Sequence, residues 1–211
     1  MRKRVVAGLL LLVLLCLAGC GKGKEERISE SNVVEIKKDG SVRHTMKDEF
    51  PSEYYDEEML KDFVMREASE YNKEYGKDAI SVKKLDTEDE QVTLVMEYKT
   101  AEDYEQFNGY SFYCGTIADA REAGYDFSEA ELLEAGFEPE KRTTQETPSI
   151  GEEQLLGMGS RRILIVDVPQ GENLLVETSG KILYINGAKY VKKNIAMIEG
   201  DNSMPAYLVY K

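Results

Sequence analysis

Hydrophobic and polar positions divide this 211-residue chain into an apolar leader and a longer, more polar remainder. Arg2, Lys3 and Arg4 precede an uncharged run at residues 5–21 that is nearly all Leu, Val, Ala and Gly. A basic start, an apolar centre and small residues at the end are typical of a secretory signal peptide. The alternative is an uncleaved transmembrane helix. It is disfavoured because the run of 17 residues is at the short end of what spans a bilayer.

The first ordered element predicted is a β-hairpin over residues 33–46. A two-residue turn would place Ile36 opposite Arg43. A three-residue turn with Gly40 in the left-handed conformation instead places Ile36 opposite Val42. We prefer the second register because it collects the apolar side chains on one face. That face contains Val34, Ile36, Val42, His44 and Met46.

Apolar residues at helical spacing predict one long helix over residues 56–75, which Gly76 would end. Acidic residues in its first turn suit the positive end of the helix dipole. Alternating apolar residues then predict a second hairpin, with strands at residues 80–85 and 91–99. The predicted apolar stripe of the helix comprises Leu60, Val64, Ala68, Tyr71 and Tyr75, widened by Met59 and Phe63.

Capping patterns predict two shorter helices in the middle of the chain. Thr100 followed by Asp103 marks the start of the first, and Ser128 followed by Glu131 marks the start of the second. Glycines at the expected ends support both. The predicted helices cover residues 100–109 and 128–136, with a strand at 110–114 and a helical turn at 117–123 between them.

The C-terminal part changes to a β pattern after a polar, proline-containing connector. The sequence therefore predicts an α+β fold: β-hairpins with one long helix and short helices, followed by a C-terminal antiparallel β-meander. We expect the meander to pack on the N-terminal part or to form a small second lobe. Its predicted elements are a short helix at residues 152–156 and strands at 162–168, 174–178, 181–185 and 207–210.

The end of the leader, Leu17-Ala18-Gly19-Cys20, resembles the lipobox of bacterial lipoproteins. This resemblance implies diacylglyceryl transfer to the Cys20 thiol, cleavage before that residue, and a lipid anchor in the extracytoplasmic face of the cell membrane. Residues 115–118, 123–127 and 180–184, together with residues 17–20, resemble segments of small surface lipoproteins of clostridial-type Gram-positive bacteria. This second resemblance implies surface anchoring and no particular activity.

These patterns define the predicted organisation of the chain. The signal peptide precedes Cys20, and the polar residues that follow have no periodicity, which predicts a disordered tether. The predicted divisions are a signal peptide at 1–19, lipidated Cys20 with its tether at 20–32, an N-terminal α+β part at 33–140, a connector at 141–151 and the meander at 152–211.

Charge and cysteine content limit the partners. The whole chain has 27 basic and 40 acidic residues, and loss of three basic residues with the signal leaves a formal charge of −16. An acidic surface repels nucleic acid, so no nucleic-acid partner is expected. Cys16 would leave with the signal and Cys20 would carry the lipid. Only Cys114 then remains, and no intramolecular disulfide is predicted.

No residue set predicts a catalytic, cofactor-binding or metal site. His44 is the single histidine, so a Ser-His-Asp triad or a zinc site would have to use it. Cys114 and His44 form a conceivable nucleophile–base pair. However, Cys114 lies in a strand-like run without a neighbouring basic residue, on the same face as Phe112, and a buried inert thiol is preferred.

Two charged segments have competing interpretations. The acidic residues 86–90 suggest calcium, but position 91, where an EF-hand loop requires glycine, is occupied by Gln91. A solvated hairpin turn is therefore preferred. Arg161 and Arg162 suggest an anion site, and a charge pair at a strand edge accounts for them equally well.

Thirteen tyrosines and no tryptophan suggest a recognition surface, because a tyrosine ring packs while its hydroxyl stays wet. The same residues also suit half-buried core positions. We expect a non-catalytic binding or envelope-associated module with a protein, peptide or glycan partner. The alternative is a carboxylate-based envelope hydrolase, which needs no histidine. The tyrosines of the N-terminal half are Tyr54, Tyr55, Tyr71, Tyr75, Tyr98, Tyr104, Tyr110, Tyr113 and Tyr125.

Overall fold

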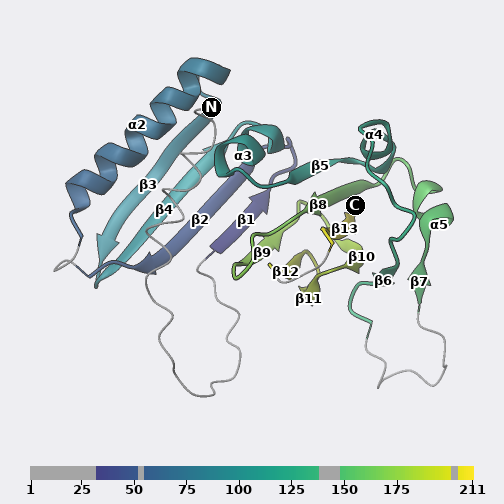
Figure 1. The fold of residues 1–211 in the computed structure, drawn as a ribbon. Coiled ribbons are helices and arrows are strands. Elements are labelled where there is room, and N and C mark those ends of the chain that lie inside the picture. The colour runs from purple at the N-terminus through teal and green to yellow at the C-terminus, as the bar shows by residue number, and fades with distance from the viewer. Residues whose placement is uncertain (1–31, 52–54, 138–147, 201–203) are drawn as a thin grey trace.

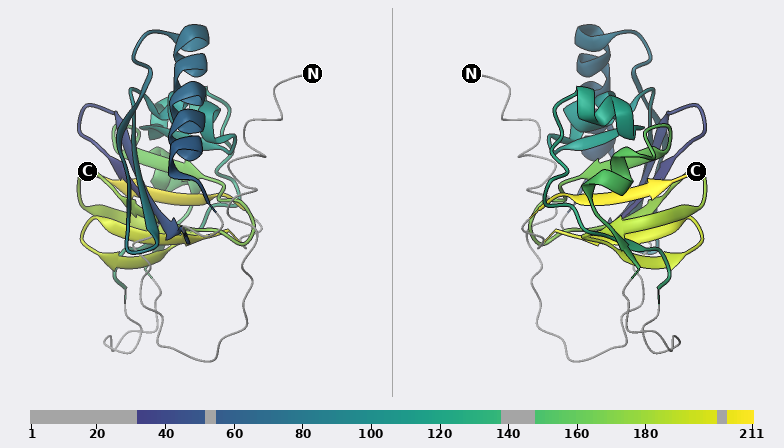
Figure 2. Two further views of the ribbon diagram at one scale, coloured as in Figure 1. Left: turned by 90° about the vertical axis from the view of Figure 1, so that its left-hand side faces the viewer. Right: turned by 90° about the vertical axis from the view of Figure 1, so that its right-hand side faces the viewer.

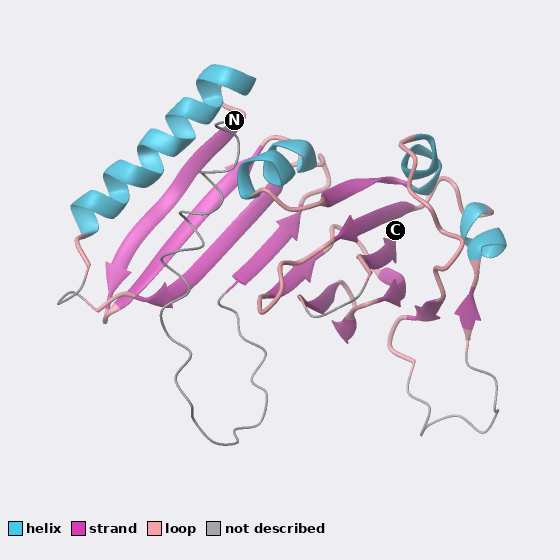
Figure 3. Cartoon of the chain, viewed as in Figure 1, coloured by secondary structure: helices cyan, strands magenta, loops and turns pink. Residues whose placement is uncertain are grey.

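Two β-sheets and four helices make up the part of the chain that the computed structural model describes (Figure 1). In the view of Figure 3 the helices lie along the upper side of the strands. The predicted α+β fold with antiparallel C-terminal strands is confirmed. The signal peptide, Cys20 and most of the tether and connector lie outside the described residues, which are 32–51, 55–137, 148–200 and 204–211.

The seven-stranded sheet combines strands from the two ends of the chain. Its one parallel pair joins β1 to β9, with Val34 opposite Val176. The other neighbours are antiparallel. In order across the sheet the strands are β11 (Lys189–Lys192), β12 (Ile195–Glu199), β9 (Asn173–Glu177), β1 (Asn32–Ile36), β2 (Val42–Glu49), β4 (Gln91–Tyr98) and β3 (Ile80–Glu88).

The six-stranded sheet is antiparallel and has β5 at one edge. Figure 2 shows the yellow C-terminal strand, β13, lying across the purple and blue N-terminal strands. In order across the sheet the strands are β5 (Phe112–Thr116), β8 (Arg162–Val166), β13 (Ala206–Tyr210), β10 (Ile182–Asn186), β6 (Leu132–Glu134) and β7 (Ser149–Ile150).

One apolar core joins the two sheets. Val34 of the first sheet and Leu208 of the second belong to the same buried cluster, together with Val64 and Phe107 from two helices. A second cluster on the other face of the six-stranded sheet includes Ile163. No helix in the described ranges is long and apolar enough to cross a membrane. The helices are α2 (Glu57–Tyr75), α3 (Ala101–Asn108), α4 (Ile117–Glu122) and α5 (Glu152–Leu156).

The first hairpin has the predicted register. Ile36 pairs with Val42, and Val34 pairs with His44. Gly40 has a φ of +87°, a conformation that residues with a Cβ rarely adopt. The hydrophobic pattern and the turn residue therefore agree on one pairing, and β1 begins only one residue earlier than predicted.

Helix α2 also has the predicted ends. The Asp56 carboxylate accepts a hydrogen bond of 3.0 Å from the backbone N–H of Met59, and Gly76 follows the last turn. The apolar stripe is narrower than predicted, because Met59 is 72% exposed and Tyr75 is 46% exposed. The buried residues of the helix are Val64, Ala68 and Tyr71.

The helix predicted at residues 128–136 is wrong, and β6 takes its place. Ser128 does not cap a helix there: its backbone N–H donates to the Asp126 carboxylate at 2.9 Å in a turn. Leu132 is fully buried, and the following residues pair with β10. Burial and strand pairing therefore override the local capping pattern.

Strands β11 and β12 were not predicted from the sequence. Lys192, which ends β11, and the two residues between the strands, Lys193 and Asn194, interrupt the apolar pattern. Pairing with β9 nevertheless makes β12 an internal strand, with Ala196 and Ile198 buried. A neighbouring strand from elsewhere in the chain therefore defines this element.

His44 lies in the core, as its register predicts, with 4% of its surface exposed. Its Nε2 is 2.6 Å from the Oδ1 of Asn32, and its ring packs edge-on against Tyr104. Oδ1 only accepts hydrogen bonds, so Nε2 donates and Nδ1 holds a lone pair. In the described part of the chain, this buried Nδ1 has no partner. Burial lowers the pKa of His44 from 6.5 to about 3.

This burial predicts a loss of stability in mild acid. Below pH 6.5 the unfolded chain binds a proton at His44, while the folded chain stays neutral until about pH 3. Between pH 7 and pH 5 the unfolding free energy of the wild type should fall by about 2 kcal/mol more than that of His44→Gln. Urea unfolding of both proteins at each pH measures this difference. The Asp and Glu residues are the same in both proteins, so their pH-dependent contributions to the unfolding free energy cancel. An equal fall in both proteins would contradict the prediction.

Candidate functional site

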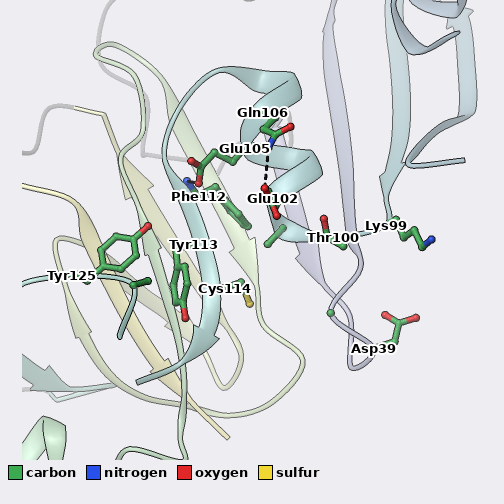
Figure 4. A pocket seen from close by; sticks show the side chains of 14 residues that line it. Asp39, Lys99, Thr100, Glu102, Glu105, Gln106, Phe112, Tyr113, Cys114 and Tyr125 are labelled. Carbon is green, nitrogen blue, oxygen red and sulfur yellow. Dashed lines mark hydrogen bonds between the residues drawn. The ribbon is translucent and has the colours of Figure 1, made fainter. Parts of the chain in front are cut away.

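An open cavity of about 630 Å³ lies beside β5 (Figure 4). Helix α3 and the β1–β2 turn contribute one side, and the turn at residues 123–125 contributes the other. Phe112, Tyr113 and Cys114 of β5 line it between them. β5 begins two residues later than predicted, and the first three of its five residues line the cavity.

Two tyrosines form the aromatic side of the cavity. The ring centroids of Tyr113 and Tyr125 are 4.8 Å apart, and Figure 4 shows both rings on the same side of β5. Both residues are half-buried. Burial raises the pKa of each hydroxyl, so both are neutral at physiological pH. Such rings offer apolar area together with a hydrogen-bonding group.

Carboxylates supply most of the charge of the cavity lining. Glu102 and Glu105 project from α3, and Asp39 projects from the β1–β2 turn. The Glu105 carboxylate accepts a hydrogen bond of 3.0 Å from the backbone N–H of Phe112. Hydrogen bonds from Ser41 lower the pKa of Asp39, which keeps it ionised. Lys99 is the one basic residue in the lining, so the lining is predominantly negative.

Local sequence explains how α3 presents these acids. Thr100 and Asp103 form the predicted capping box: the Asp103 N–H donates to the Thr100 hydroxyl oxygen at 3.0 Å, and the Asp103 carboxylate accepts from the Thr100 N–H at 3.1 Å. Glu102 and Glu105 are three residues apart, which places them on one helix face. The sequence analysis missed these acids, although this spacing was a usable signal.

Cys114 lies in a more polar setting than predicted. Its Sγ is 3.1 Å from the Oη of Tyr210 and 3.5 Å from Nη2 of Arg162. The expectation of no basic neighbour is therefore wrong, because the adjacent strand β8 supplies Arg162. Burial raises the pKa of Tyr210, whose neutral hydroxyl stays beside the thiol. Cys114 does share a face with Phe112, and both pack on the main core.

The structure does not bring Cys114 and His44 together as a nucleophile–base pair. His44 hydrogen-bonds to Asn32, whereas the polar contacts of Cys114 are with Tyr210 and Arg162. Arg161, the other member of the arginine pair, is exposed. Alternation along the strand therefore separates the two guanidinium groups, and the pair does not form one anion site.

The acidic segment at residues 86–90 forms a hairpin end. β3 extends to Glu88, and Asp89 and Glu90 make the turn with φ values of 52° and 59°. Lys84 forms an ion pair of 3.0 Å with Asp86. Over the described residues, no group of three or more His, Cys, Asp or Glu side chains is arranged to hold a metal ion.

Most of the remaining tyrosines that the structure describes in the N-terminal half are not part of the cavity. Tyr98 and Tyr104 are fully buried, and Tyr71 is 9% exposed. Tyr104 packs against His44, Tyr98 and Phe112. These tyrosines are core residues. Tyr54 lies outside the described residues.

Glu172 is the carboxyl group most relevant to the hydrolase alternative. It is half-buried, and burial raises its pKa. A raised pKa suits a general acid.

The half-burial of Cys114 predicts slow thiol labelling in the folded protein. Reaction with an aromatic disulfide reagent should be about tenfold slower in native protein than in urea, because Tyr210 and the strand cover part of the sulfur. Cys20→Ala protein without its signal provides the single-thiol sample. Equal rates in the two states would place the sulfur fully on the surface.

Comparison with known proteins assigns no family or function to the chain. No protein-family model matches the chain, and no curated protein or solved structure matches it.

Proposed function

We propose that this chain is a lipid-anchored extracytoplasmic protein that binds a protein, peptide or glycan partner in the cavity beside β5. The observation that carries the proposal is the combination of half-buried Tyr113 and Tyr125 with the carboxylates that line the same cavity. Aromatic residues are enriched in the centres of binding interfaces. The resemblance of residues 17–20 to a lipobox supplies the location.

The anchor and tether fit such a role. A diacylglyceryl group on Cys20 supplies two acyl chains, and two membrane signals are what stable anchoring needs. The twelve residues after Cys20 extend to at most ~40 Å. The cavity would therefore work at the cell surface, close to the membrane and the wall, where peptide and glycan partners are present.

Glu172 supports carboxylate-based hydrolysis as a second candidate. Burial raises its pKa, and a raised pKa suits a carboxyl group that acts as a general acid. A screen against peptidoglycan and polysaccharide substrates tests this candidate. Activity that Glu172→Gln abolishes would replace the binding proposal.

Lipid attachment is predicted to depend on Cys20. Cys20→Ala should remain unprocessed and should not incorporate a fatty-acid probe, because it lacks the thiol that accepts the diacylglyceryl group. Cys16→Ala is the matched control and should be processed and labelled normally. Electrophoretic mobility and probe incorporation in cells measure both effects. Labelling of Cys20→Ala would show that the lipobox assignment is wrong.

Binding is predicted to depend on the aromatic side of the cavity. Tyr125→Ala should weaken the binding of peptidoglycan fragments or of members of a peptide library about tenfold or more, since the loss of a central aromatic contact often costs over 1.4 kcal/mol. Tyr75→Ala removes an exposed tyrosine outside the cavity and should bind as the wild type does. Calorimetry or fluorescence anisotropy measures the affinities. Equal affinity of all three proteins would contradict the proposed site.

A further inference from the structure

The backbone of β5 presents an open strand edge to the cavity. β5 is the edge strand of the six-stranded sheet, with β8 on its one paired side. In Figure 1, α3 precedes β5 at one end and α4 follows it at the other. The cavity includes three consecutive residues of this strand.

Hydrogen bonds at both ends of β5 establish which backbone groups face outward. The Asp167 N–H donates to the Ser111 C=O, and the Ile117 N–H donates to the Arg161 C=O, each at 3.0 Å. Antiparallel bonding alternates along a strand. The residues between these two that bond to β8 are therefore the odd-numbered ones. The backbone N–H and C=O groups of Phe112, Cys114 and Thr116 therefore point away from β8, toward the open side of the strand.

Two of the outward-facing backbone N–H groups of β5 already donate hydrogen bonds to side chains. The Phe112 N–H donates to the Glu105 carboxylate at 3.0 Å, and the Thr116 N–H donates to the Asp119 carboxylate at 3.3 Å. Among the described residues, no hydrogen bond is formed by the N–H or C=O of Cys114. The middle of the strand therefore offers one donor and one acceptor in the arrangement that a neighbouring strand uses.

The surroundings of this edge indicate the chemistry of the occupant. A strand added beside β5 would direct alternate side chains toward opposite faces of the sheet. Asp39, Glu102 and Glu105 give the lining its negative charge, and Tyr113 and Tyr125 supply two rings. The Glu105 carboxylate is close enough to Tyr125 to contribute, together with burial, to the raised pKa of its hydroxyl. Negative charge next to amphipathic rings suits a peptide that has both basic and apolar side chains.

We propose that the cavity binds an extended peptide with basic side chains, which pairs with Cys114 and adds to β5 as a further strand. This inference rests on the proposed binding function and names its partner class. Strand addition obtains affinity from main-chain bonds and specificity from side-chain pockets. Glu105 protects the edge in the free protein, because its carboxylate accepts a hydrogen bond from the Phe112 N–H, two residues before the N–H and C=O of Cys114 that are unbonded among the described residues.

The first test removes the outward donor. In Cys114→Pro the backbone N–H is lost on the unpaired side of an edge strand, where proline is tolerated. Cys114→Ala lacks the same thiol but keeps the N–H. The probe is an acetylated, amidated heptapeptide with alternating Lys and Val. Cys114→Pro should bind it about tenfold more weakly than Cys114→Ala does, since one hydrogen bond is lost. Circular dichroism checks that both variants fold.

The second test uses the wild-type protein, so it does not depend on the folding of a variant. Binding of the heptapeptide should slow hydrogen exchange of the Cys114 amide about tenfold or more, because a new hydrogen bond protects it. The Tyr113 amide, which faces β8, is the internal control. N-methylation of the central peptide nitrogens should abolish binding. A heptapeptide with Glu in place of Lys should bind about tenfold more weakly.

The outcomes separate this inference from the proposed function. Equal affinity of Cys114→Pro and Cys114→Ala, or an unprotected Cys114 amide in the bound state, would overturn strand addition. Failure of the Lys-Val peptide to bind would also overturn it. If Tyr125→Ala still weakened the binding of peptidoglycan fragments in that case, the binding function would stand without strand addition. If the Lys-Val peptide did not bind and Tyr125→Ala did not weaken the binding of peptidoglycan fragments, both strand addition and the proposed binding function would be overturned.

Discussion

The parallel pairing of β1 with β9 is the contact on which the rest of the structure depends. It joins the first strand that the structure describes to a strand more than a hundred residues later, with Val33 opposite Leu175 and Val34 opposite Val176. The N-terminal hairpins thereby continue into β9, β12 and β11 as one sheet. Closing so long a loop costs conformational entropy, and burial of the shared core offsets that cost.

This pairing also determines where β5 lies. β8 and β9 are consecutive in the chain but belong to different sheets, so the short connection between them keeps β8 close to β9. β5 pairs with β8 and has no further strand beside it in the described chain. The open edge and the cavity are therefore consequences of how the two sheets are joined. The acids of α3 reach the cavity because α3 directly precedes β5.

His44 and Cys114, the two residues considered as a nucleophile–base pair, contact different parts of the structure. His44 is neutral and packed among aromatic rings, with a hydrogen bond to Asn32. Cys114 contacts a tyrosine hydroxyl and an arginine, which come from two other strands. The feature that distinguishes the cavity is the backbone N–H and C=O of Cys114, unbonded within the described chain, rather than its sulfur. Polar groups of an edge strand are exposed to partners in any sheet, and here they lie beside an acidic surface and two tyrosines.

The sequence by itself determined the elements whose hydrogen bonds are local. The register of the first hairpin, the ends of α2 and the Thr100–Asp103 box follow from residues a few positions apart, because turn and cap geometry depends on near neighbours. For the site, the sequence indicated only tyrosines as a class. The tertiary structure alone decided that β9 pairs with β1, that residues 132–134 form a strand, and that Arg162 meets Cys114. Each of these depends on which distant surfaces become buried together, and local periodicity carries no information about that choice.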